Sequence, residues 1–139
     1  MVRPLQPFAD EELLLIQHLR AIPAVTALCP AERITTALPP SPTWPAVVLH
    51  AVGSGSPDPV LWVDASSVQV DVLGPADRQA CKALTLTVRA AILAAANDRY
   101  AAGCLVSASE ELRPQWLPDT LSSPPLPRFT ARYRLTIHP

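Results

Sequence analysis

The hydrophobic positions of this chain recur with two different periods, which predict its strands and helices. At the start of the stretch Ser67–Leu84, apolar and polar residues alternate, as they do in a half-buried strand. Val68, Val70 and Val72 would then share one face of that strand. After a Gly-Pro pair the spacing changes to that of an amphipathic helix, which we expect over about Ala76–Asn97. Its apolar face would carry Leu84, Val88, Ala91, Ile92 and Ala95.

The Gly74-Pro75 pair between this strand and helix has the position where many α/β enzymes hold a phosphate. Such a site needs several glycines, so that backbone N–H groups can approach the anion. Here one glycine is followed by a proline, which has no N–H to donate. We therefore interpret the pair as a helix initiator, with Pro75 at the first helical position and Asp77 in the first turn.

A second helix is predicted near the start of the chain, over about Glu11–Ile22. Asp10 is a suitable N-cap, and the acidic first turn interacts favourably with the helix dipole. Pro23 would end the helix. The apolar stripe would consist of Leu15, Ile16 and Leu19, widened by Leu13 and Leu14.

Short apolar or alternating runs between prolines and glycines predict the remaining strands. We expect them over Arg33–Leu38, Ala46–Val52, Gly103–Leu112 and Arg128–Ile137. Residues 53–59 have the composition of a loop, which we expect at the protruding tip of a long hairpin. Residues 113–127 are typical of an extended loop stiffened by prolines.

These elements occur in the order α-β-β-β-α-β-β. Short connections between successive strands favour antiparallel pairing, so we expect an α+β fold with a mostly antiparallel sheet and two helices packed on one face. A length of 139 residues predicts a single domain, residues 1–139.

Composition excludes several classes of partner. The net charge of −1 provides no excess of basic residues for nucleic acid or an anionic membrane. No apolar run is long enough to span a membrane, and the first residues lack the apolar core of a signal peptide. The three cysteines, Cys29, Cys81 and Cys104, have no metal-site spacing and indicate free buried thiols in a reducing compartment.

The sequence contains no recognisable catalytic, metal-binding or cofactor-binding motif. His18, His50 and His138 are not near a serine or cysteine in the pattern that nucleophilic catalysis needs, and we expect structural or solvent-exposed roles for them. Cys81 and Cys104 would approach each other if the second helix packs on the Gly103–Leu112 strand, but small buried side chains explain them better than a metal does. We expect no enzyme activity and no cofactor.

Four segments give the chain a family resemblance. They are RITTALPPSPTWPAVVLHAVG, VQVDVLGPADRQACKALTLTVRAAILAA, PQWLPD and RFTARYRLTI, which cover most of the chain from Arg33 onward. In this order they resemble the tail terminator proteins of long-tailed bacteriophages (siphoviruses) and prophages, especially those of actinobacterial hosts.

The resemblance implies a small α+β protein that forms a ring, usually a hexamer, at the head-proximal end of the phage tail. Such a ring stops polymerisation of the major tail tube protein once the tape-measure protein is covered, and then offers a surface to head-tail connector proteins. DNA would pass through its lumen only as cargo. The resemblance also implies a location in the virion, at the head-tail interface, after assembly in the cytoplasm of the bacterial host.

A ring needs head-to-tail contacts, and five residues are candidates for them. Trp116 and Leu117 lie between prolines in the last long loop, where stiff backbone reduces the entropy lost on association. Trp62 is a second candidate anchor, whereas Trp44 should pack under its own strand. Arg132 and Arg134 share the polar face of the last strand and would contact a neighbouring subunit or line the lumen.

Packing within the chain remains an alternative for each tryptophan, and a solvated sheet face remains one for the two arginines. Two other functions also stay open. The chain would also suit a head-tail connector or tube-like assembly protein, and a small ligand-binding domain or enzyme would need a pocket of converging polar groups that no residue cluster predicts.

Overall fold

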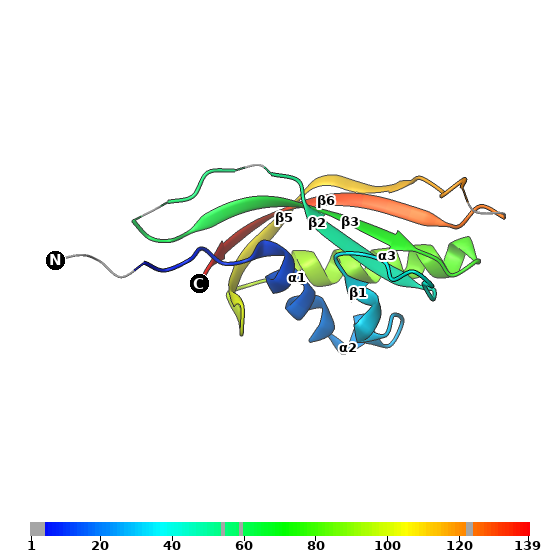
Figure 1. Cartoon of the computed structure of the whole chain (residues 1–139), viewed down its shortest axis with the longest axis horizontal. Helices are drawn as coiled ribbons and strands as arrows, with labels where there is room; N and C mark the ends of the chain where they lie inside the picture. Colours follow the sequence, from blue (N-terminus) through cyan, green and yellow to red (C-terminus); the bar gives the residue numbers. More distant parts are fainter. Residues whose placement is uncertain (1–4, 54, 59, 122–123) are drawn as a thin grey trace.

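A six-stranded sheet with helices on one face forms the body of the protein (Figure 1). The computed structural model describes residues 5–53, 55–58, 60–121 and 124–139. Its helices are α1 (Glu11–Arg20), α2 (Pro23–Thr26) and α3 (Arg78–Leu93), with a 3₁₀ turn at Ala31–Arg33. Its strands are β1 (Ile34–Thr35), β2 (Ala46–Ala51), β3 (Asp64–Leu73), β4 (Asp98–Tyr100), β5 (Gly103–Trp116) and β6 (Arg128–His138).

The strands lie in the order β1-β2-β3-β6-β5-β4, with the long strands at the centre. β1 and β2 are parallel, and every other neighbouring pair is antiparallel. The expected α+β fold, with a mostly antiparallel sheet and its element order, is confirmed. α2 adds a single helical turn, and β4 adds a short edge strand that the sequence did not indicate.

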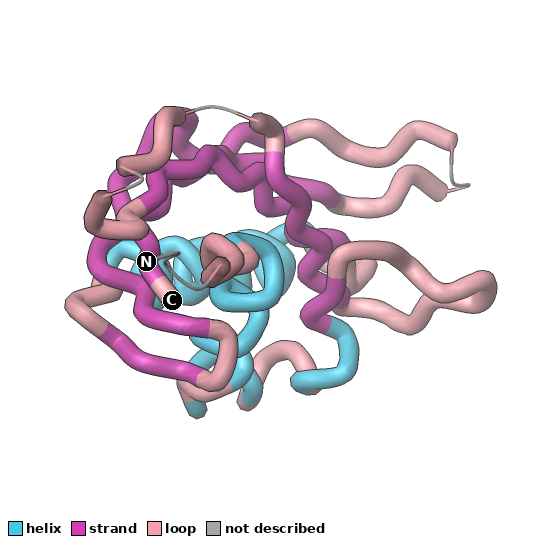
Figure 2. Tube along the Cα trace, turned by 60° about the vertical axis from the view of Figure 1, so that its left-hand side comes forward, coloured by secondary structure: helices cyan, strands magenta, loops and turns pink. Residues whose placement is uncertain are grey.

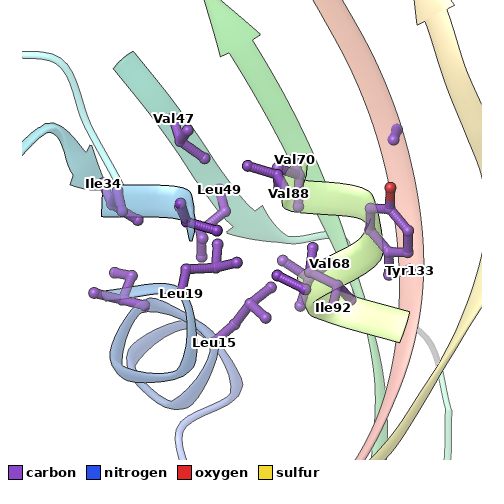
Figure 3. Packing of buried hydrophobic residues seen from close by; sticks show 14 of the residues in the cluster. Leu15, Leu19, Ile34, Val47, Leu49, Val68, Val70, Val88, Ile92 and Tyr133 are labelled. Carbon is purple, nitrogen blue, oxygen red and sulfur yellow. The ribbon is translucent and has the colours of Figure 1, made fainter. Parts of the chain in front are cut away.

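The main core lies between the sheet and the two longer helices (Figure 3). Leu15 and Leu19 of α1 and Ile92 of α3 meet there, and none of the three side chains is solvent-exposed. From the sheet, the alternating apolar face of β6 is buried as its pattern predicts, through Phe129, Ala131, Tyr133, Leu135 and Ile137. Burial of these residues supplies most of the driving force for folding.

Both longer helices are shorter than expected, because side-chain caps and prolines set their ends. α3 begins at Arg78, since the Asp77 carboxylate accepts a hydrogen bond from the backbone N–H of Gln79 at 3.0 Å. The prediction of Pro75 at the first helical position is therefore wrong. Similarly, α1 ends at Arg20, and Pro23 does not simply stop it but starts α2.

The strand predictions also need correction. The expected strand Arg33–Leu38 shrinks to β1, because Arg33 belongs to the 3₁₀ turn and a proline-rich segment follows the strand. β5, in contrast, continues to Trp116, into residues expected to form a loop. Parts of three predictions lie outside the described residues, namely residues 1–4 of the chain start, residues 54 and 59 of the 53–59 loop, and residues 122–123 of the proline-rich loop.

Among the described residues, none of the helices combines the length and the apolar character that a membrane crossing requires.

Candidate subunit interface

The candidate anchors lie at the two ends of the elongated molecule. The β2–β3 connection, which carries Trp62, lies at the end where the chain termini are found (Figure 1). The β5–β6 connection, which begins with Leu117 directly after Trp116, lies at the opposite end (Figures 1 and 2). The structure therefore does not bring Trp62 and Trp116 together.

Trp62 contacts the N-terminal segment of its own chain. Its indole N–H donates a hydrogen bond to the Gln6 carbonyl at 2.8 Å, and its ring stacks on Phe8 with the ring centroids 5.2 Å apart. The backbone at Trp62 is left-handed, with φ of 58°. Beside it, Val60 and Leu61 remain 75% and 68% exposed. This end thus presents apolar side chains to solvent while Trp62 fixes the N-terminal segment.

Trp116 is partly packed and partly exposed. Its ring lies against Phe129 at a centroid distance of 5.2 Å, and the Arg78 guanidinium lies 4.3 Å from the ring centre as a cation–π contact. The residue nevertheless remains 38% exposed. Leu117 is 50% exposed, with its backbone N–H and carbonyl bonded to Arg128. Both residues therefore expose part of their apolar surface, on backbone that is paired with β6.

Irregular pairing of β5 with β6 positions Trp116. The register shifts by one residue between Leu105 and Ser107, between Glu110 and Leu112, and between Leu112 and Gln115. Because each one-residue shift exchanges the two faces of a strand, the three shifts together place Trp116 opposite Phe129, on the helix side of the sheet.

A bidentate ion pair connects α3 to this part of β5. The Arg89 guanidinium donates to the two carboxylate oxygens of Glu110 at 2.8 and 2.9 Å, and this hydrogen bonding raises the pKa of Arg89. Nearby, burial together with the Glu110 charge raises the pKa of Tyr133 to about 12. The ion pair and the neutral phenol hold the helix against the strand.

A pocket of about 260 Å³ lies between α3 and the end of β5. We call it the basic pocket, since Arg78, Lys82, Arg89 and Arg113 line it together with the apolar surfaces of Leu86 and Trp116. Within the described part of the chain, neither Lys82 nor Arg113 forms an ion pair.

Sequence reasoning missed the basic pocket. One signal was present, because residues 78, 82 and 89 are spaced by about whole turns and share one face of α3. The contribution of Arg113 carried no such signal, since it depends on how the end of β5 packs beside α3.

Arg132 and Arg134 lie on the face of β6 opposite its buried apolar residues. Arg134 pairs with Ser67 and Ser109 on the neighbouring strands and is exposed. Arg132 is half-buried, and its Nε atom is buried without a hydrogen-bond partner in the described residues. The Ser67 hydroxyl donates to the Glu111 carboxylate, so that a β5 side chain reaches across β6 to β3. The two arginines share a polar sheet face and are remote from the helix-side basic pocket.

The joint between β3 and α3 has a packing role. Gly74 has φ of +67°, and a Cβ atom there would lie 2.8 Å from the Cβ of Trp44. The Gly74 N–H donates to the Pro127 carbonyl at 2.8 Å, which ties the joint to the start of β6. Trp44 is half-buried against this joint, next to its own strand β2.

His18 is hydrogen-bonded through both ring nitrogens, and burial keeps the thiols of Cys29 and Cys81 protonated. The Nε2 of His18 donates to the Ala91 carbonyl at 2.7 Å, so Nδ1 accepts from the Tyr100 hydroxyl at 2.7 Å. The three cysteines are free and buried, as expected, and burial raises the pKa of Cys29 and Cys81 to about 11. In the described residues, no group of histidine, cysteine and carboxylate side chains is arranged to hold a metal ion.

The fold is that of a small α+β protein with partly exposed apolar side chains at both ends and a basic pocket between α3 and β5. Over residues 14–120 the chain matches the family described as Tail completion protein gp17, and it belongs to that family. It is therefore a phage tail-associated structural protein, located in the virion tail. No curated protein matches the chain.

The fold itself is shared with a solved virion structure. One chain in the virion of a native gene transfer agent (GTA) particle superposes with a TM-score of 0.70. The match covers 93% of this chain and 95% of that chain, at 20% sequence identity. The two chains thus have the same fold along nearly their whole length.

Proposed function

We propose that this protein is the tail terminator of its virion. In this proposal residues 1–139 act as one domain, and a hexameric ring of copies caps the head-proximal end of the tail tube. The ring stops polymerisation of the tube protein and gives the head-tail connector proteins a surface to bind. It works by binding alone, without catalysis.

The observation that carries the proposal is the presence of exposed apolar side chains at both ends of the molecule. Val60 and Leu61 lie at one end, and Trp116 and Leu117 at the other. A closed ring needs two different surfaces on each copy, because its contacts are head-to-tail. Membership of the tail completion family supports the same function.

Deletion of the gene tests this role directly. Without a terminator, tail tubes should grow to uncontrolled length and should not join heads, as seen by electron microscopy of lysates. Complementation with the intact gene should restore tails of uniform length. Tails of normal length that lack heads would contradict the terminator role and favour a head-tail connector. Purified protein that polymerises into open tubes would also contradict it and would favour a tube-like assembly protein.

We further propose that Arg132 and Arg134 act on the face of the sheet that lacks the helices. They would contact a neighbouring subunit or line the lumen through which DNA passes, which fits an exposed Arg134 and an Arg132 whose Nε has no partner among the described residues. Replacing both with alanine should reduce ring formation or infectivity. A double variant that forms rings and gives normal titres would contradict this role.

A further inference from the structure

The basic pocket has more positive charge than its own chain neutralises. Glu110 pairs with Arg89, and Arg78 lies over the Trp116 ring. Lys82 and Arg113 remain without an ion pair in the part of the chain that the structure describes. A partner that fits this pocket therefore carries a carboxylate to pair with these two cations and an apolar side chain to contact Leu86 and Trp116.

The opposite end of the molecule carries side chains of this kind. Asp58 is exposed, and its carboxylate accepts hydrogen bonds from the backbone N–H groups of Val60 at 2.9 Å and Leu61 at 3.2 Å. These bonds hold an acid beside two exposed apolar side chains. The Asp58 N–H also donates to the Val63 carbonyl, which fixes the position of Asp58 at the end of the connection.

We infer that Asp58, Val60 and Leu61 of one copy enter the basic pocket of the next copy in the ring. The carboxylate would face Lys82 and Arg113, and the apolar pair would cover Leu86 and the exposed edge of Trp116. This inference rests on the proposed terminator function and specifies its subunit contact.

The chemistry favours a second copy of this chain over nucleic acid. A DNA backbone would satisfy the cations but would leave the apolar surfaces of Leu86 and Trp116 uncovered. The loop end supplies both a charge and apolar surface, on the same chain. Because the two surfaces lie at opposite ends and do not overlap, one contact repeats from copy to copy in a single direction, as a ring requires.

A charge-exchange experiment tests the pairing. Arg113→Glu and Asp58→Lys should each weaken self-association about tenfold or more, because each places like charges in contact. The double variant should recover a large part of this loss, since the two exchanged charges attract again, although Lys82 then repels the lysine introduced at position 58. Arg99→Glu is the matched control, because Arg99 is also an exposed arginine but lies on β4, and it should leave association unchanged.

Association would be measured by sedimentation velocity over a concentration series and by capping of isolated tail tubes. Circular dichroism melting would verify that each variant is folded. Single variants that associate normally would overturn the inference. So would a double variant that stays as weak as the single ones, since the two residues would then not face each other.

Disulfide trapping gives a second, independent readout. Mixing a Val60→Cys protein with a Leu86→Cys protein should yield a covalent dimer on mild oxidation, while the three native cysteines stay buried. Leu28→Cys is the control partner, because Leu28 is 45% exposed, close to the 47% of Leu86, but lies beside α2. Equal trapping with Leu28→Cys, or none with Leu86→Cys, would overturn the inference.

These results separate the inference from the function on which it rests. Rings and capped tubes that persist in both single charge variants would refute this contact and leave the terminator proposal intact. A wild-type protein that stays monomeric in solution and also fails to cap tubes would refute both.

Discussion

Replacing Trp116 with alanine should weaken both the fold and the assembly, and the structure gives a magnitude for each. The residue is 38% exposed, and its remaining surface packs on Phe129 and under Arg78. For a tryptophan of about 250 Å², the packed part is about 155 Å², which corresponds to about 4 kcal/mol at about 25 cal/mol per Å². Alanine keeps some contacts and the unfolded chain is partly compact, so we expect a loss of about 2–3 kcal/mol.

The exposed part of Trp116 sets the effect on assembly. About 95 Å² is free for a neighbouring subunit, on the same estimate of the total surface. Complete coverage of that area would contribute about 2.4 kcal/mol, so the Trp116→Ala variant should associate up to about 50-fold more weakly.

Two assays measure these effects separately. Urea unfolding followed by circular dichroism gives the free energy of unfolding, and thermal melting should show a midpoint lower by about 7–10 °C for a chain of 139 residues. Sedimentation velocity gives the association midpoint. Leu121→Ala is the stability control, because Leu121 is 97% exposed on the same connection and should change stability by less than about 0.5 kcal/mol.

Either half of the reasoning can be refuted. Unchanged stability would mean that Trp116 does not pack on Phe129 in solution. A large loss of stability with an unchanged association midpoint in the folded variant would mean that the exposed edge of Trp116 is not part of the subunit contact.

Three further predictions concern the joint before α3 and the buried thiols. Asp77→Ala should lower the free energy of unfolding by about 0.5–2 kcal/mol in urea titrations, because α3 loses its N-cap, whereas Asp77→Asn should retain most of it. Gly74→Ala should lower the melting temperature, since a Cβ at this positive φ would meet Trp44; an unchanged melting curve would contradict the packing of the joint. Because the pKa of Cys29 and of Cys81 is raised to about 11 in the folded protein from 9.0, the unfolded thiols ionise first, and stability should fall as pH rises from about 9 to about 11. Urea titrations of the Cys29→Ala and Cys81→Ala variants should show a smaller fall.

The elements that the sequence predicted are those in which one face is buried and the other is not. β6 follows a period of two along its whole length, and the apolar face of α3 follows a helical period, so burial alone specifies them. Local signals misled at the joint, where Pro75 suited a helix start, because the Asp77 cap determines where α3 begins.

Other features depend on pairing between distant segments and could not be predicted from local sequence. The three register shifts of β5 against β6 place Trp116 on the helix side, and the packing of β5 beside α3 brings Arg113 to the basic pocket. Trp116 was identified as a candidate from its place between two prolines, whereas its contacts with Phe129 and Arg78 could not be predicted. The basic pocket was missed for the same reason, apart from the helical spacing of its residues on α3.

The sheet has short strands at both edges, and among the described residues β4 pairs only with the first residues of β5, Gly103–Leu105, which leaves the rest of β5 as an open edge. β1 contains two residues and β4 three, and Arg99 of β4 adds an exposed charge. Long, flat edges offer unpaired backbone groups to which another strand can add, copy after copy, whereas short or charged edges suppress such addition. The open part of β5 is interrupted by register shifts, and bulges of this kind also oppose the addition of another strand. For a protein proposed to end a polymer, these features matter because they disfavour extension of its own sheet by further subunits.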